Sequence, residues 1–77
     1  MEEIMKELLN SEKVQNELES MHEDALNMCS TLTDKAWNNL KKNVLRDALR
    51  DFINEHLNMA DKREELETLL LKEANVQ

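Results

Sequence analysis

The stretch LTDKAW, residues 32–37, decides the fold, because it ends one helix and begins the next. Thr33 is a residue type that favours the N-cap position, and an acidic residue such as Asp34 stabilises the positive end of a helix. Leu32 and Trp37 occupy the two positions of a hydrophobic staple across that cap. We therefore expect a helix that begins at Asp34, with a reversal of the chain just before it.

Upstream of this cap, apolar residues recur in a four-three pattern that is typical of a helix packed lengthwise on another helix. The members of this seam are Val14, Leu18, Met21, Ala25, Met28 and Leu32. A second apolar patch near the N-terminus is out of phase with the seam. The phase changes at Asn10-Ser11, where either residue could cap a new helix. The sequence therefore predicts a helix over residues 2–31, either continuous or broken at residues 10–11.

Downstream, a broad apolar face predicts a second helix over residues 34–58 that touches more than one neighbour. This face carries Trp37, Leu40, Val44, Leu45, Ala48, Leu49, Phe52 and His56. The run Asp61-Lys62-Arg63-Glu64 resembles a capping box with Asp61 in the cap position. We favour a break near residues 58–61 and a third helix over 61–75. The alternative is one unbroken arm of about 65 Å.

Composition narrows the fold class. The chain has 77 residues, a net charge of −7, and neither Gly nor Pro, which excludes glycine-built phosphate loops and tight hairpin turns. We expect a complete all-α protein with one domain over residues 1–77, either an antiparallel helical hairpin or a three-helix bundle. A chain of this size with only two aromatic residues builds a small core, so we also expect homo-oligomerisation, most simply a dimer.

The cellular compartment is predicted from features that are not visible in the sequence. No signal peptide and no apolar run long enough to span a membrane are visible. The single Cys29 cannot form an internal disulfide. We expect a cytoplasmic protein. Its Asn, Lys and Glu usage is typical of an AT-rich genome, such as that of a phage or a low-GC bacterium.

Charge is uneven along the chain. Residues 1–32 carry two Lys against eight acidic residues, whereas residues 33–58 carry five basic residues against four acidic ones. The first helix is therefore acidic and the second weakly basic, which favours their antiparallel pairing. Exposed ion pairs of this kind contribute only about 0–1 kcal/mol each.

A basic stripe is the first candidate site. It consists of Lys35, Lys42, Arg46 and Arg50, which fall within about 80° of one another on the second helix. Such a stripe could contact an acidic protein or follow a phosphate backbone, although most charged stripes are solvated faces. The net charge of −7 and the lack of a stacking aromatic speak against nucleic acid.

The second candidate is the acidic face of the first helix, which includes Glu12, Glu19 and Glu23. An ordered array of carboxylates could occupy the groove of a nucleic-acid-binding protein, but a solvated helix face explains it more simply. A weak metal candidate combines Glu19 and His22, which form a Glu-x-x-His pair, with Cys29 two turns from His22. A helix-flanking His and a small buried Cys are the simpler interpretation, so no metal is predicted.

The function that these observations favour is a non-enzymatic protein-interaction module: a small adaptor, regulator or inhibitor that acts through helical surfaces. Its partners would be a protein of unknown identity and a second copy of the chain, with no cofactor and no membrane. The alternative is a nucleic-acid-associated regulator that uses the basic stripe, and a metal-binding bundle comes third. No nucleophile with a supporting base and oxyanion site is suggested by the sequence.

Overall fold

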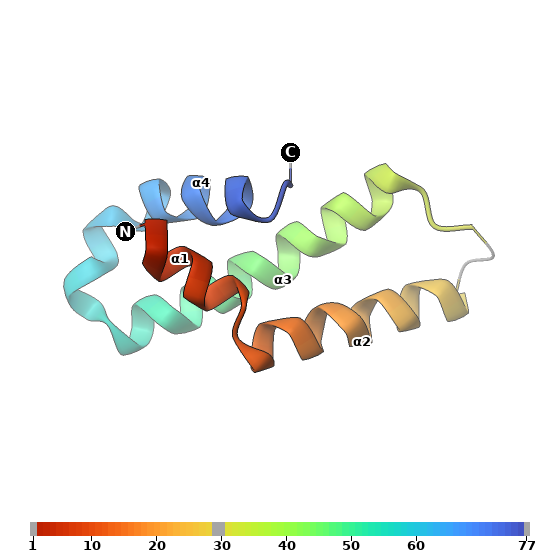
Figure 1. The fold of residues 1–77 in the computed structure, drawn as a ribbon, viewed down its shortest axis with the longest axis horizontal. Coiled ribbons are helices and arrows are strands. Elements are labelled where there is room, and N and C mark those ends of the chain that lie inside the picture. The colour runs from red at the N-terminus through yellow and green to blue at the C-terminus, as the bar shows by residue number, and fades with distance from the viewer. Residues whose placement is uncertain (1, 29–30, 77) are drawn as a thin grey trace.

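The computed structural model describes residues 2–28 and 31–76, and within these residues it contains helices and no strand. The helices are α1 (Glu2–Leu9), α2 (Glu12–Met28), α3 (Asp34–Glu55) and α4 (Arg63–Glu73), with a 3₁₀ helix, η1 (Leu57–Lys62), between the last two. The all-α fold class is thereby confirmed (Figure 1). The described residues form four α-helices where the sequence suggested two or three.

α1 and α2 meet at Asn10 and Ser11, where the sequence allowed a break in the helix expected over residues 2–31. The Ser11 hydroxyl donates a hydrogen bond to the Leu8 carbonyl oxygen at 2.8 Å and accepts one from the Val14 amide at 3.4 Å. One side chain thus satisfies backbone groups on both sides of the break. Because of this break, α1 leaves the axis of α2 and packs elsewhere.

The reversal before α3 is built as the sequence predicts. Thr33 has extended backbone angles, and its hydroxyl accepts a hydrogen bond from the Ala36 amide at 3.1 Å. The Thr33 carbonyl oxygen accepts the first helical hydrogen bond, from the Trp37 amide at 2.9 Å. The N-cap at Thr33 and the start of α3 at Asp34 are both confirmed.

We predict that Thr33→Ala lowers the free energy of unfolding by about 0.5–2 kcal/mol, because it removes the side-chain cap of α3. Urea unfolding followed by circular dichroism measures this change. Thr31→Ala is the matched control, since Thr31 is exposed and its hydroxyl has no partner among the described residues. Equal losses in the two variants would contradict the role of Thr33 as the cap.

The end of α3 differs from the sequence expectation. α3 stops at Glu55 rather than residue 58, and the imidazole of His56 stacks on the Phe52 ring with centroids 4.3 Å apart. Asp61 does not cap the last helix. It lies inside η1, and α4 has Lys62 at its N-cap without a side-chain hydrogen bond. The capping box expected at Asp61 fails because the backbone continues through it as a 3₁₀ turn.

α4 is followed by a turn in which Asn75 takes the left-handed position that glycine usually occupies. Asn75 adopts a left-handed conformation with φ 55°, which asparagine tolerates better than most residues. The Val76 amide donates to the Leu71 carbonyl oxygen at 2.9 Å and the Asn75 amide to the Lys72 carbonyl oxygen at 3.1 Å, the pattern of a Schellman motif. This turn directs Val76 back into the core, where it is buried.

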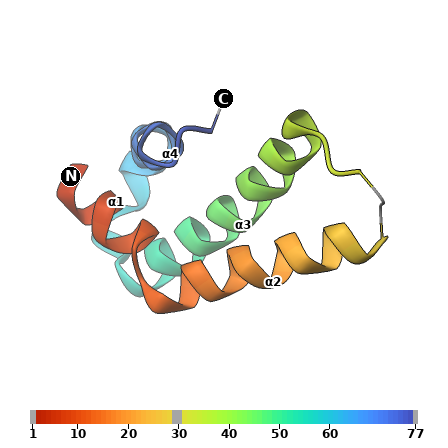
Figure 2. The same ribbon diagram turned by 45° about the vertical axis from the view of Figure 1, so that its right-hand side comes forward.

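α3 is the central helix of the arrangement. α2 lies antiparallel along one side of it, while η1 and α4 return along another side (Figure 1). α1 packs across α4 and also touches α3, as the view along α4 shows (Figure 2). Both α1 and α4 therefore lie at the same end of α3, the end from which the chain enters η1.

The hydrophobic core is confined to that end. Its buried members are Met5, Val14, Leu45, Leu49, Ile53, Leu66, Leu70 and Val76. The molecule is elongated, with extents of 43 × 21 × 17 Å, because the other end of the α2–α3 hairpin projects beyond the core. We call residues 21–28 and 31–40 the hairpin tip. None of them belongs to this core cluster.

Candidate functional site

The basic stripe is exposed at Lys35, Arg46 and Arg50, and one of its members also contacts α4. The Arg46 guanidinium forms an ion pair with Glu67 of α4, and Arg50 lies 3.6 Å from Asp47 on its own helix. The other two members are placed differently: Lys42 is half-buried, and Lys35 lines a shallow cleft that Asn75 also lines, just beyond α4. Two of the four cations thus have carboxylate partners within the chain. The stripe is a poor track for a phosphate backbone.

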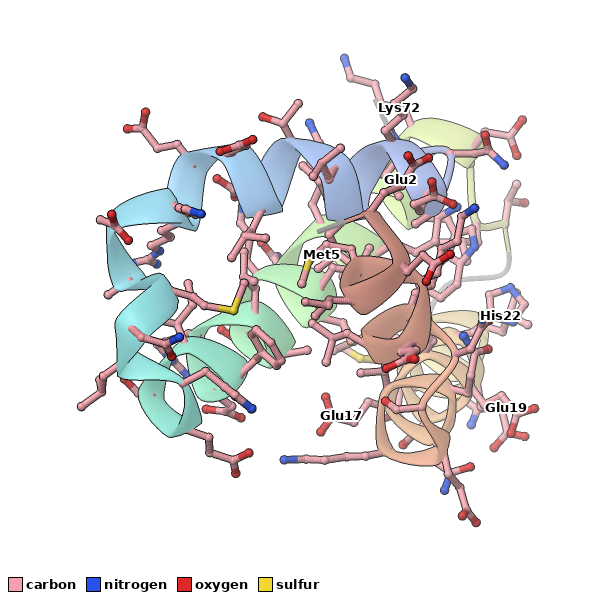
Figure 3. All side chains as sticks on the ribbon, turned by 60° about the vertical axis from the view of Figure 1, so that its left-hand side comes forward. Glu2, Met5, Glu17, Glu19, His22 and Lys72 are labelled. Atoms are coloured by element: carbon pink, nitrogen blue, oxygen red, sulfur yellow. The ribbon has the colours of Figure 1, made fainter. Side chains whose placement is uncertain are left out.

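The acidic face lies on the outer side of α2. Glu12, Glu19 and Glu23 are exposed, and none has an ion-pair partner in the part of the chain that the structure describes. Figure 3 places Glu19 on one side of α2 and Glu17 on the opposite side. These carboxylates are therefore separated into an outer set and a set that borders α3.

The weak metal candidate is not assembled in the described residues. His22 lies on the same side of α2 as Glu19 (Figure 3), and its ring packs against the Trp37 indole with centroids 4.6 Å apart. Cys29 lies outside the described residues. Within residues 2–28 and 31–76, no three His, Cys, Asp or Glu side chains gather closely enough to hold a metal ion.

Trp37 belongs to the contact between α2 and α3 rather than to the main core. It is half-buried, with the His22 ring on one side and the Lys41 ammonium 5.8 Å from its ring centroid. The sequence placed Trp37 on the apolar face of its helix. In the structure Trp37 meets α2 through His22.

An apolar cleft opens at the hairpin tip, beside two methionines of the apolar seam, Met21 and Met28. Its volume is about 430 Å³, and it opens between the last two turns of α2 and the first two turns of α3. Its apolar lining consists of Met21, Ala25, Met28, Leu32, Ala36 and Leu40. Met28 is 85% exposed, the highest value among the large apolar side chains described as exposed.

The cleft is open because no third helix among the described residues packs on this side of α2 and α3. α1 and α4 pack on the other end of α3 (Figure 2), and among the described residues neither helix contributes to the lining of this cleft. Ala25 on α2 and Ala36 on α3 each contribute a single methyl group to the lining, too little to fill the space between two helices. The apolar seam therefore continues past the core without a cover.

A second cleft of about 270 Å³ continues from the first along the same side of the hairpin. Met21 and Asp24 line both clefts, and Glu17, Val44 and Asp47 line only the second. We call the two together the seam groove. It runs beside the line where α2 and α3 meet, from the tip toward the core.

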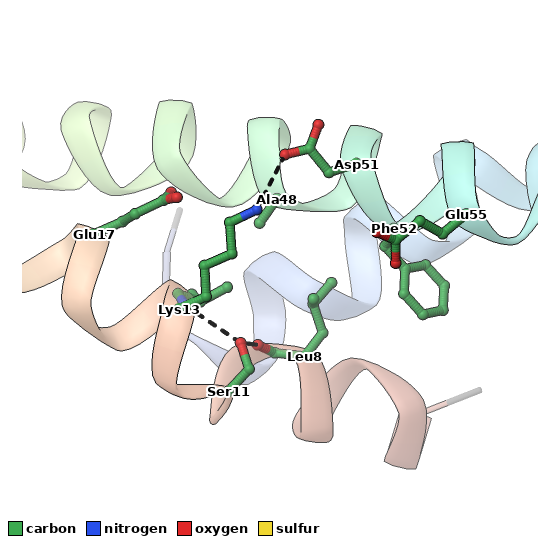
Figure 4. A pocket seen from close by; sticks show the side chains of 9 residues that line it. Leu8, Ser11, Lys13, Glu17, Ala48, Asp51, Phe52 and Glu55 are labelled. Atoms are coloured by element: carbon green, nitrogen blue, oxygen red, sulfur yellow. Dashed lines mark hydrogen bonds and ion pairs between the residues drawn. The ribbon is translucent and has the colours of Figure 1, made fainter.

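The seam groove ends at an ion pair. Beyond Glu17 a smaller cleft of about 140 Å³ follows, and Lys13 reaches across it from α2 toward α3 (Figure 4). The Lys13 ammonium lies 3.7 Å from the Asp51 carboxylate. This contact joins the two helices and closes the groove at its inner end.

The charges beside the seam groove are acidic. Glu17 and Asp24 come from α2 and have no ion-pair partner among the described residues, and Asp47 comes from α3 and is shared with Arg50. No Lys or Arg is among the described residues that line the two clefts. The seam groove therefore has an apolar floor and acidic sides.

Comparison with protein-family models, with curated proteins and with solved structures found no match to this chain. In the described part of the chain, no helix is both long and apolar enough to cross a membrane.

We predict that Met5→Ala and Met28→Ala differ sharply in stability. Met5 is fully buried in the core, so its truncation should cost about 2–5 kcal/mol. Met28 is 85% exposed, so its truncation should stay within about 0.5 kcal/mol. Chemical denaturation of both variants checks this, and a large loss for Met28→Ala would mean that the tip is part of the folded core.

Proposed function

We propose that this chain is a small, non-enzymatic protein-interaction module, an adaptor, regulator or inhibitor, and that the hairpin tip is its contact surface. The observation that carries the proposal is the gathering of solvent-facing apolar side chains at the tip, with Met28 at 85% exposure beside a cleft of about 430 Å³. Single exposed apolar residues are common on soluble proteins, whereas a contiguous apolar cleft is typical of an interaction site.

The form of the surface also favours a protein as the partner. The seam groove is an open channel between two helices, and an amphipathic helix lays its apolar face into such a channel. The methionines Met21 and Met28 are flexible and polarisable, which suits a surface that adapts to a partner. The proposal includes no cofactor and, with a single cysteine in the chain, places the protein in the cytoplasm.

Self-association stays a prediction, and in the structure a smaller apolar surface is available for it than the sequence suggested. The sequence expectation rested on the small core and on the surplus apolar surface of the seam in the first helix and the broad face of the second. In the structure α1 and α4 cover the inner part of that face, including Leu45, Leu49 and Ile53. The hairpin tip and the seam groove offer apolar surface, among the described residues, on which a second copy could pack.

We predict that a photo-reactive residue at the tip forms a specific cross-link in cells. The variant Met28→p-benzoylphenylalanine, expressed in cells of the source organism, should give one discrete adduct after illumination. Leu57→p-benzoylphenylalanine is the matched control, because Leu57 is 72% exposed but lies at the opposite end of α3. Mass spectrometry identifies the adduct. No adduct at position 28, or equal adducts at both positions, would contradict the proposal.

The alternative, a nucleic-acid-associated regulator, predicts a different result. A stripe with three or four phosphate contacts would give an affinity whose logarithm falls with the logarithm of salt with a slope of about −3. We expect no complex with DNA or RNA at physiological salt, because Arg46 and Arg50 already have carboxylate neighbours and the net charge is −7. A salt-dependent complex that the triple change of Lys42, Arg46 and Arg50 to Glu abolishes would make the alternative the function.

A further inference from the structure

We infer that the seam groove binds a short amphipathic helix of another protein, one that carries Lys or Arg on the flanks of its apolar stripe. This inference rests on the proposed function and names the chemistry of the partner. Three properties of the groove lead to it: its length, the charges on its sides, and the small number of residues that line it.

The length fits a short helix. From Glu17 to Met28, α2 rises by roughly 17 Å, which is about three turns. A helix of that length presents apolar residues at positions i, i+3 or i+4, and i+7 on one face. The floor of the groove offers apolar surface along this distance, from Val44 at the inner end to Met28 and Leu40 at the tip.

The charges select the flanks of the bound helix. Glu17 and Asp24 stand on the α2 side and Asp47 on the α3 side, with no Lys or Arg among the lining residues described. Lys13 pairs with Asp51 at the inner end of the groove, and Arg50 lies 3.6 Å from Asp47 on its own helix. A helix with basic flanks would place opposite charges beside both walls, and the net charge of −7 would speed its encounter.

A second copy of the chain fits less well. A two-fold pairing of the same surface would bring the acidic sides of one groove against those of the other, which opposes association. Arg46, which could relieve this repulsion, is paired with Glu67 of α4. The tip cleft is lined by eight residues, whereas a stable interface between two folded proteins uses about 20–30 on each side.

The test uses a fluorescein-labelled amphipathic peptide of 18 residues with Leu at heptad positions and Lys on both flanks. A matched peptide replaces every Lys with Glu and keeps every Leu. We expect the Lys peptide to bind in fluorescence anisotropy at least about tenfold more tightly than the Glu peptide, and to weaken as salt rises. Equal binding of the two peptides would overturn the inference.

Two pairs of charge variants locate the site. The double variant Glu17→Lys with Asp24→Lys should lower the affinity for the Lys peptide by at least about tenfold, since both acids border the seam groove. Glu19→Lys with Glu23→Lys changes the net charge equally on the outer face of α2 and should leave binding within about threefold. Equal weakening by the two pairs would overturn the inference, because binding would then depend on net charge alone.

One further pair of variants separates groove binding from simple charge attraction. Met28→Asp adds an acidic residue to the protein, so charge attraction alone would raise its affinity for the Lys peptide. The groove model expects weaker binding, because Met28 lines the cleft. Leu26→Asp is the control, since Leu26 is 48% exposed and is not a lining residue of either cleft. Circular dichroism of both variants verifies the fold, and tighter binding by Met28→Asp would overturn the inference.

The cross-link at position 28 distinguishes failure of this inference from failure of the proposed function. If adding the Lys peptide reduces the cross-link between position 28 and the partner, the result supports both the inference and the proposed function. If the cross-link forms and its yield does not change when the Lys peptide is added, the inference is overturned, but the proposed interaction module is still supported. A dimer in light scattering at tens of micromolar that Met28→Asp dissociates identifies the occupant as a second copy, which also overturns it.

Discussion

The burial of one end of α3 beneath α1 and α4 is the interaction on which the rest of the structure depends. Leu45, Leu49 and Ile53 of α3 enter the core there, and each buried side chain of this size contributes about 1.5–3 kcal/mol. α1 has 8 residues and α4 has 11, whereas α3 has 22. The two short helices therefore cover only part of α3. The remainder pairs with α2 alone and becomes the hairpin tip.

Features that depend on a few neighbouring residues could be predicted from the sequence. The cap at Thr33 acts within three residues, and the break at Ser11 is held by hydrogen bonds of the same short range. Asp61 shows the limit of this approach, because its residue type and spacing suited a cap. The 3₁₀ turn that carries the chain from α3 to α4 includes it instead. The path of the backbone between two packed helices is set by the packing, which local sequence does not encode.

The candidate sites depend on tertiary placement and could be predicted only in part. Helical periodicity placed Arg46 on the basic stripe, but it could not show that α4 and its Glu67 would lie alongside. The seam pattern likewise placed Met28 among residues that pack on a second helix. In the structure Met28 is exposed, because the cover provided by α1 and α4 ends before the tip. The small residues Ala25 and Ala36, which line the cleft, leave part of the space between the two helices unfilled.

The acidic sides of the seam groove give one explanation for two properties of the tip. A two-helix projection with an apolar floor is prone to pair with its own copies, and like charges around an apolar patch oppose that pairing. Glu17 and Asp24 provide such charges, and neither is used in an ion pair among the described residues. The same carboxylates attract a helix with basic flanks. Charges that keep the free groove open would thus also select the helix that fills it.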